Sequence, residues 1–216
     1  VALAASGVMS EEELYSLSER RGDILKTVNN SKGGSMTAVS AGGAHVRNLL
    51  GHLSDVTLAN VNSPRQCIIS GGLDALERAH SVLSQNKIKA KPIAVSAAFH
   101  SPLMKPAVQE LSQALLRASL KTPQVKVYSN TLAKAYPTEP GKIASLLCEH
   151  LVKPVEFQAQ IEQMYEDGAR VFVECGPSAV LSGLVSDILE GKEHTILTLE
   201  RAGRNGLTQV QNLLAQ

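Results

Sequence analysis

The first candidate for chemistry is a histidine between an apolar strand and a helix. His100 follows the strand-like run of residues 88–95, and Pro102 stands at the first-turn position that helices favour for proline. Working groups in α/β folds lie at the carboxyl ends of strands, and an imidazole exchanges protons near neutral pH. His100 is therefore a candidate general base. The alternative is a histidine that only packs or caps at the junction.

The second candidate is Arg21, within a run of polar residues on a predicted helix. A guanidinium pairs bidentately with a carboxylate and keeps its charge, so it suits an anionic substrate. Arg20 projects about 100° away around the helix, so only one of the two can face a given site. Taken by itself, the run Ser18-Glu19-Arg20-Arg21 is typical of a solvated helix face.

The middle of the chain has the pattern of four strands and two helices. Apolar periodicity and turn residues place these elements at residues 36–40, 44–53, 56–61, 66–70, 73–86 and 88–95. Their order, βαββαβ, is the split βαβ arrangement of a ferredoxin-like unit. We therefore predict a ferredoxin-like subdomain over residues 36–95, in which the turn at 62–65 joins the second and third strands.

The flanking segments, residues 1–35 and 96–216, have the pattern of an α/β core. Ser10 and Glu13 form a capping box, which predicts a helix to about Val28 and a loop at 29–35. Beyond His100, helices and strands alternate at residues 101–120, 125–128, 142–151, 155–167, 171–174, 179–189, 195–199 and 207–214. The helix at 101–120 should bury Leu111, Leu115 and Leu116. Such alternation with short links indicates a parallel sheet.

The composition excludes several classes of function. The net charge of +1 and the 3% aromatic content leave neither a basic surface for nucleic acid or anionic membranes nor a base-stacking platform. The apolar runs are too short to span a bilayer. Three scattered cysteines argue against a disulfide framework, have no metal-ligand spacing, and suit a reducing, cytoplasmic compartment. We expect no metal.

A set of motifs in register resembles one family of acyltransferases. Ala98-Phe99-His100-Ser101, with Pro102-Leu103-Met104, is similar to the histidine motif of malonyl-CoA:acyl-carrier-protein transacylases and of polyketide or polyunsaturated-fatty-acid synthase acyltransferase domains. Other similar segments are Ala5-Ser6-Gly7-Val8-Met9-Ser10, Arg20-Arg21-Gly22, Asn60-Val61-Asn62-Ser63-Pro64, Ile69-Ser70-Gly71, Lys153-Pro154-Val155 and Glu174-Cys175-Gly176-Pro177. The resemblance implies a hydrolase-like parallel-sheet core with an inserted ferredoxin-like subdomain.

The resemblance also implies a reaction. His100 would take the proton from a serine hydroxyl and return it to the leaving thiol, with its ring oriented by a backbone carbonyl near His150. Arg21 would hold the free carboxylate of a malonyl group. The substrates would be malonyl-CoA, a coenzyme A thioester, and an acyl carrier protein, with no cofactor.

Two further residues are implied as lining the substrate pocket. Phe99 would narrow it beside C2 of the acyl group and favour malonyl over methylmalonyl by about 1–3 kcal/mol, although Phe99 also fits a core position. Asn62 would line the pocket, although an Asn before Ser-Pro is commonly a turn former. The remaining histidines have no partner motif and are predicted to be surface residues: His45, His52, His80 and His194.

The serine nucleophile of that family has no counterpart in this chain. Its Gly-x-Ser-x-Gly elbow exposes a hydroxyl beside oxyanion-hole amides, and Gly176-Pro177-Ser178-Ala179-Val180 lacks the second glycine. By the family's spacing, the elbow would lie a few residues before Val1. We expect an N-terminal segment that carries the nucleophile and several core strands, because the incomplete sheet would otherwise expose apolar edges.

Three functions fit the sequence. The first is a malonyl transferase that works through an acyl-serine intermediate, with the serine upstream of this chain. The second is an acyltransferase remnant without a nucleophile, which would serve as a carrier-protein docking or structural module of a synthase. The third is an unrelated hydrolase in which Arg21 is incidental.

Overall fold

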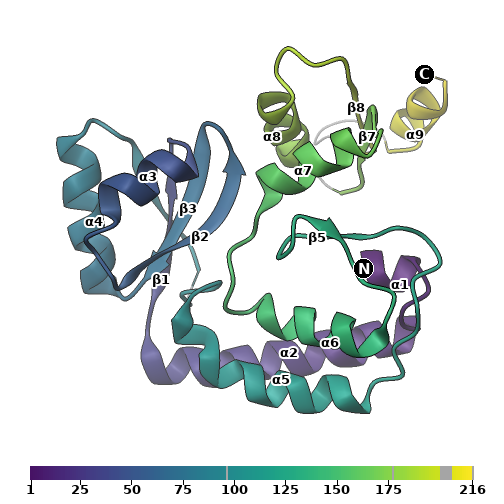
Figure 1. Ribbon diagram of the computed structural model, residues 1–216, viewed down its shortest axis with the longest axis horizontal. Helices are drawn as coiled ribbons and strands as arrows, with labels where there is room; N and C mark the ends of the chain where they lie inside the picture. Colours follow the sequence, from purple (N-terminus) through teal and green to yellow (C-terminus); the bar gives the residue numbers. More distant parts are fainter. Residues whose placement is uncertain (96, 177, 200–205, 216) are drawn as a thin grey trace.

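The computed structural model has three parts, which Figure 1 shows together. It describes residues 1–95, 97–176, 178–199 and 206–215, so Ser96, the first residue of the second predicted core segment, and Pro177 lie outside the described residues. A four-stranded sheet with two helices forms one part, a layer of long helices the second, and a C-terminal group of helices and two strands the third. Within these ranges every helix is too short or too polar to cross a lipid bilayer.

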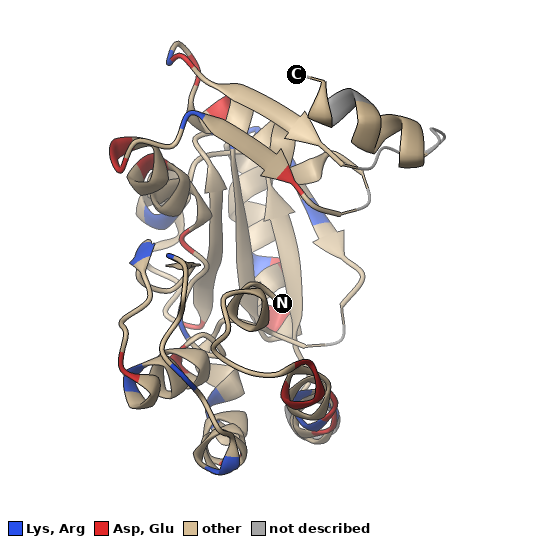
Figure 2. Cartoon of the chain, turned by 90° about the vertical axis from the view of Figure 1, so that its right-hand side faces the viewer, with Lys and Arg blue, Asp and Glu red and all other residues tan. Residues whose placement is uncertain are grey.

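The N-terminal helices form as the capping residues predict. After the short α1 (Ala2–Ala5), α2 (Glu11–Lys32) begins at Ser10, whose hydroxyl accepts a hydrogen bond from the Glu13 amide at 3.2 Å. The acidic first turn of α2 is a red patch in Figure 2. The predicted loop at 29–35 is wrong in its first part, since α2 continues to Lys32. Asn and Ser weaken a helix only slightly, and the helix ends at Gly33, where φ is +50°.

The middle of the chain folds into an antiparallel sheet in the order β2-β3-β1-β4. The elements follow one another as β1 (Ser35–Val39), α3 (Gly43–Leu50), β2 (Val56–Ser63), β3 (Gln66–Gly71), α4 (Leu73–Gln85) and β4 (Ala90–Ile93). Both helices cover one face of the sheet, where Val39, Val46 and Leu83 are fully or almost fully buried. The turn predicted at 62–65 is shorter, because bulges in β2 extend that strand to Ser63.

The helix layer consists of α2, α5 (Lys105–Arg117) and α6 (Pro140–Glu149). The short 3₁₀ turn η1 (Pro102–Met104) directly precedes α5. Leu111 and Leu115 are buried in its core, as predicted, but Leu116 is 81% exposed. One residue along a helix is a rotation of about 100°, which turns Leu116 away from the core.

The predicted strand at 125–128 is mostly absent. Only β5 (Tyr128–Ser129) pairs, with the equally short β6 (Lys134–Ala135), and the residues before it have no partner strand among the described residues. Because backbone groups in a strand need a neighbouring strand, apolar residues alone do not make one.

The C-terminal group contains the parallel pairing that the sequence predicts, in two strands. It consists of α7 (Phe157–Glu166), β7 (Val171–Glu174), α8 (Val180–Ile188), β8 (Thr195–Thr198) and α9 (Gly206–Leu214). β7 and β8 run parallel, and Phe172 packs toward the core of α7 and α8. On the other side Val171 is 58% exposed and Val173 is 43% exposed. Parallel sheets in α/β proteins are normally covered on both faces, so this exposure is unusual.

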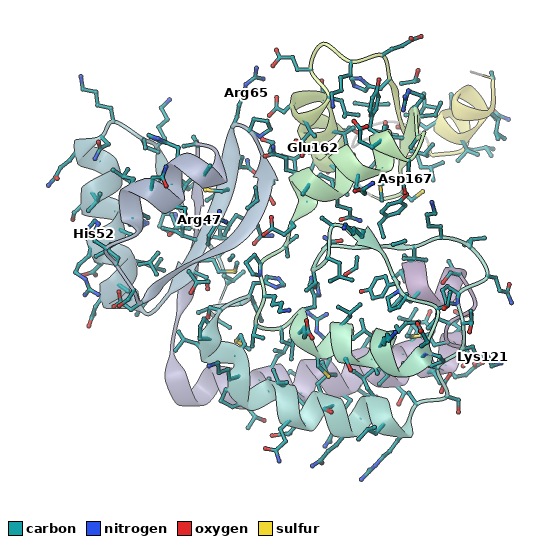
Figure 3. All side chains as sticks on the ribbon, viewed as in Figure 1. Arg47, His52, Arg65, Lys121, Glu162 and Asp167 are labelled. Atoms are coloured by element: carbon teal, nitrogen blue, oxygen red, sulfur yellow. The ribbon has the colours of Figure 1, made fainter. Side chains whose placement is uncertain are left out.

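Backbone and side-chain contacts join the C-terminal group to the four-stranded sheet, and one of them is the Ser63 hydroxyl, which donates to Asp187 Oδ2 at 3.3 Å. Val155, before α7, exchanges backbone hydrogen bonds of 2.8 Å with β2. Arg65, at the tip of the β2–β3 hairpin, reaches α8 and the residues after it, as Figure 3 shows. Its guanidinium donates to Asp187 Oδ1 at 2.8 Å and to Glu190 Oε2 at 2.6 Å.

Candidate active site

His100 lies in a tight turn between β4 and η1 with an unusual backbone conformation. Its φ of +55° is in the left-handed region, which costs about 1 kcal/mol or more for a residue with a Cβ atom. The neighbouring Ser101 stabilises the turn, since its hydroxyl donates to the Ala98 carbonyl at 2.6 Å and accepts from the Leu103 amide at 3.3 Å. Such strain persists only where the surroundings enforce it, which is typical of functional sites.

The end of α6 fixes the orientation of the His100 ring. His150 is the C-terminal cap of that helix, so its carbonyl has no partner within the helix and is free to accept. It lies 2.7 Å from Nδ1 of His100. A carbonyl can only accept, so Nδ1 carries the proton, and Nε2 is left with a lone pair in the neutral ring. His100 therefore has the tautomer that a general base requires.

The side chain of His150 packs beside the same ring. The two ring centroids are 4.9 Å apart, and the ring planes are inclined by 51°. Burial, with contributions from His100 and Arg21, lowers the pKa of His150 from 6.5 to about 4. Burial is also the largest cause of the lowered pKa of His100; the bond to the His150 carbonyl opposes it, and the charge of Arg21 adds to it. Both imidazoles are therefore neutral at neutral pH.

Arg21 and His150 line one cavity of about 410 Å³, called here the Arg21 cavity. Most of its wall is apolar, mainly from α1, α2, α5 and α6, and the polar residues are Ser18, Arg21, Tyr128, Asn130, Tyr136 and His150. Arg20 lines a different hollow, with Glu110 and Arg117, because it points to another side of α2. Among the described residues no carboxylate forms an ion pair with Arg21, so its guanidinium can receive an external anion.

The structure does not bring Phe99 and Asn62 to the wall of the Arg21 cavity. Phe99 is half-buried and packs against the core of the helix layer. Asn62 lies in β2, where its side-chain amide donates to Gln66 Oε1 of β3 at 2.9 Å. His100 does not line the cavity either, but its hydrogen bond to the His150 carbonyl and the effect of the Arg21 charge on its ring join it to Arg21 and His150.

Four polar residues of the cavity were not proposed from the sequence: Ser18 of α2 and three residues of a later segment. Tyr128, Asn130 and Tyr136 come from a stretch with little regular structure, where neither periodicity nor a motif marks them. Tyr136 is half-buried, and burial raises the pKa of its hydroxyl, against the smaller effect of a hydrogen bond with Ser129. Its hydroxyl therefore stays protonated and can donate or accept within the cavity.

The other histidines do not contribute to this group. His45 and His52 are exposed, as predicted, and His194 is half-buried, with its ring against the backbone of Lys192. The prediction that His80 is a surface residue is wrong, because its Nε2 lies 2.8 Å from the hydroxyl of the buried Thr37. Among the described residues, no three side chains of the metal-binding types come together as a metal site would require.

A family comparison matches almost the entire chain. The profile described as "Acyl transferase domain" matches residues 1–215. The malonyl CoA-acyl carrier protein transacylase of Bacillus subtilis is 34% identical over 193 residues, which are 87% of this chain and 61% of that protein. A polyunsaturated fatty acid synthase polypeptide from a Thraustochytrium species is 33% identical over 193 residues, which are 88% of this chain and 7% of that protein. The chain thus spans less than two thirds of the length of these relatives.

Solved structures agree with this assignment. The malonyl CoA-acyl carrier protein transacylase of Clostridium perfringens superposes with a TM-score of 0.89 at 33% identity, over 99% of this chain and 66% of that one. The acyltransferase domain from the second module of the salinomycin polyketide synthase gives a TM-score of 0.89 at 29% identity, over 100% of this chain and 50% of that one.

Proposed function

Since this chain belongs to the acyl transferase domain family, we propose that it supplies the base and the carboxylate-binding group of a malonyl transferase. The donor is malonyl-CoA, the acceptor is an acyl carrier protein, and the nucleophile is a serine in a segment upstream of Val1. The observation that carries this proposal is the convergence of two groups from distant parts of the chain. The His150 carbonyl holds the ring of His100, the charge of Arg21 acts on that ring, and the side chains of Arg21 and His150 line one cavity.

In the first half-reaction, His100 Nε2 takes the proton from the serine hydroxyl as the oxygen attacks the thioester carbonyl. The tetrahedral intermediate collapses by breaking the bond between carbon and sulfur, and the imidazolium returns the proton to the coenzyme A thiolate. In the second half-reaction His100 deprotonates the carrier-protein thiol, which attacks the acyl-serine ester and regenerates the serine. This route needs no metal and no cofactor, because His100 performs every proton transfer.

Arg21 selects an acyl group with a free carboxylate. The guanidinium lies at the wall of a largely apolar cavity and can form a bidentate pair with the malonyl carboxylate. Phe99 and Asn62 have weaker support, since neither lines this cavity. We keep Phe99 as the residue that limits substituents at C2, because it directly precedes His100, and Asn62 as a pocket residue that only a bound substrate would reveal.

The same proposal includes the finer architecture. We infer that residues 36–95 form a ferredoxin-like subdomain, which is supported by the strand order β2-β3-β1-β4 and the βαββαβ order of the elements. We infer that residues 1–35 and 96–216 belong to a hydrolase-like core that an upstream segment completes. The exposed Val171 and Val173 of β7 support this, because further core strands and helices would cover them.

The test is acyl transfer by a polypeptide that includes the upstream segment. Incubated with labelled malonyl-CoA, it should form a covalent adduct on serine that is discharged by holo acyl carrier protein. His100→Ala should form the adduct at least about a hundredfold more slowly, as expected for loss of a general base. The absence of any adduct in the unsubstituted polypeptide would refute the transferase and favour the docking module without a nucleophile.

A further inference from the structure

A short hairpin forms one wall of the Arg21 cavity. It consists of β5, β6 and the turn between them, and it lies between α7 and the helix layer (Figure 1). Four lining residues of the cavity come from this hairpin or from the residues that flank it: Val127, Tyr128, Asn130 and Tyr136. The hairpin therefore lines the same cavity as the guanidinium to which we assign the malonyl carboxylate.

The turn of this hairpin is closed by residues other than Asn130. The hydroxyl of the buried Ser129 accepts hydrogen bonds from the Thr131 and Leu132 amides at 3.2 and 3.4 Å. The Ser129 carbonyl accepts from the Ala133 amide at 2.8 Å, and Ala133 has a positive φ of +53°. An asparagine in a turn commonly binds the backbone two residues on or takes the positive φ. Because Ser129 and Ala133 fulfil these two roles, turn formation does not explain Asn130.

Helix α7 holds the hairpin in place. The amide of Glu156, at the N-terminal cap of α7, donates to the Asn130 carbonyl at 2.8 Å. One turn further, the side-chain amide of Gln160 donates to the Tyr128 carbonyl at 3.4 Å. At the C-terminal end of the helix, Asp167 accepts a hydrogen bond from the Tyr128 hydroxyl. These bonds fix the backbone at Asn130 and just before it, so the Asn130 side chain has a preorganised position at the cavity wall.

The side-chain amide of Asn130 has no hydrogen-bond partner among the described residues. The residue is half-buried at the wall of a largely apolar cavity. The Tyr128 hydroxyl is engaged with Asp167. The Tyr136 hydroxyl is engaged with Ser129. A polar group that is partly withdrawn from water is unfavourable until a partner satisfies it, so Asn130 is an available donor for a ligand in this cavity.

We propose that Asn130 is a second carboxylate-binding residue, whose side-chain amide donates to the carboxylate that Arg21 holds. This inference rests on the proposed function, because it concerns how the malonyl group is recognised. A carboxylate has about four acceptor positions, and a bidentate guanidinium occupies only part of them, which leaves positions for an amide N–H from the hairpin. Helix α2 and the hairpin then bind one carboxylate together, and selection of acyl groups with a free carboxylate depends on both.

The test compares malonyl-CoA with acetyl-CoA as donors for the polypeptide that includes the upstream segment. Asn130→Ala should lower the ratio of the two kcat/KM values by about tenfold, the loss expected for one hydrogen bond to a charged group. The loss should appear in KM rather than in kcat, because the carboxylate is bound equally before and during the reaction. Asn130→Asp should lower the ratio further, since it places a negative charge against the carboxylate at nearly unchanged volume. Asn86→Asp, at an exposed asparagine after α4, is the matched control and should leave the ratio unchanged.

A double variant provides the second readout. Arg21→Ala combined with Asn130→Ala should lower the ratio by less than the product of the two single losses, because both residues bind one carboxylate. A ratio that Asn130→Ala and Asn130→Asp leave unchanged, or an equal fall of kcat/KM for both donors, would overturn the assignment. Failure of the unsubstituted polypeptide to transfer either acyl group would instead refute the malonyl transferase. Calorimetric binding of malonyl-CoA would then decide the role of Asn130: a Kd raised by Asn130→Asp supports it, and an unchanged Kd overturns it.

Discussion

Acidification is expected to destabilise the protein through His150. The pKa of this histidine falls from 6.5 to about 4 on folding, mainly because the ring is buried and also because His100 and Arg21 are close. Between these values the unfolded chain binds a proton that the folded chain excludes. The free energy of unfolding therefore falls as the pH falls from 6.5 toward 4.

The size of the effect follows from the two pKa values. At about 1.4 kcal/mol per pH unit, the full difference between 6.5 and about 4 is worth about 3 kcal/mol. Most of this loss of stability is complete by pH 5, where the same two pKa values give about 2 kcal/mol. For a protein whose total stability is about 5–15 kcal/mol, this is a measurable fraction.

The assay is urea denaturation, followed by circular dichroism, of the unsubstituted protein and of His150→Gln at pH 7, 6, 5 and 4. The substitution removes the ionisable ring but keeps the backbone carbonyl that orients His100. The loss of stability between pH 7 and pH 5 should be about 2 kcal/mol smaller in the variant. His52→Gln, which removes an exposed histidine of the four-stranded part, should retain the full loss (Figure 3). The same pH dependence in all three proteins would refute the reasoning about the paired rings.

Three substitutions test other parts of the account. Arg21→Ala should lower kcat/KM for malonyl-CoA relative to acetyl-CoA by about 10- to 100-fold, which is the expected loss when a charged hydrogen-bonded pair is removed. Arg20→Ala is the control and should leave this ratio unchanged. An unchanged ratio in Arg21→Ala would show that Arg21 does not bind the carboxylate. Glu174→Gln should lower the free energy of unfolding by about 1 kcal/mol in urea, because this carboxylate accepts hydrogen bonds from the Leu181 and Ser182 amides at the start of α8. An unchanged free energy of unfolding would refute the role of Glu174 as a helix cap. Lys87→Gly should raise the free energy of unfolding by about 1 kcal/mol in urea, because the φ of +59° at Lys87 favours glycine; a loss of stability would refute the strain at this position.

Strong local signals in the sequence predicted most of the elements. The capping box at Ser10 fixed the start of α2, and alternating apolar residues located the four strands of the antiparallel sheet. The errors lie where local signals are weak. The end of α2 depends on the packing of Ile24 and Val28 against other helices, and Asn62 joins β2 because a bulge changes the pairing. Neither effect is visible in residue types alone.

The motifs named residues that the structure brings close together, and the cavity residues without a motif were not named. His100 and Arg21 stand in segments with recognisable neighbours, but Tyr128 and Asn130 reach the cavity from a stretch of loops whose path depends on tertiary contacts. The position of Phe99 shows that a residue next to a motif histidine in the sequence need not line the same cavity. It adjoins His100 in the chain, yet its side chain packs into the helix layer, because successive residues in a turn point in different directions.

The most direct test of the account is a structure of the longer polypeptide trapped as its malonyl ester. The account predicts that the malonyl carboxylate lies on the Arg21 guanidinium, within bidentate hydrogen-bonding distance, while the ester oxygen of the serine faces Nε2 of His100. A carboxylate bound away from Arg21, or an acyl group on a residue out of reach of His100, would contradict it.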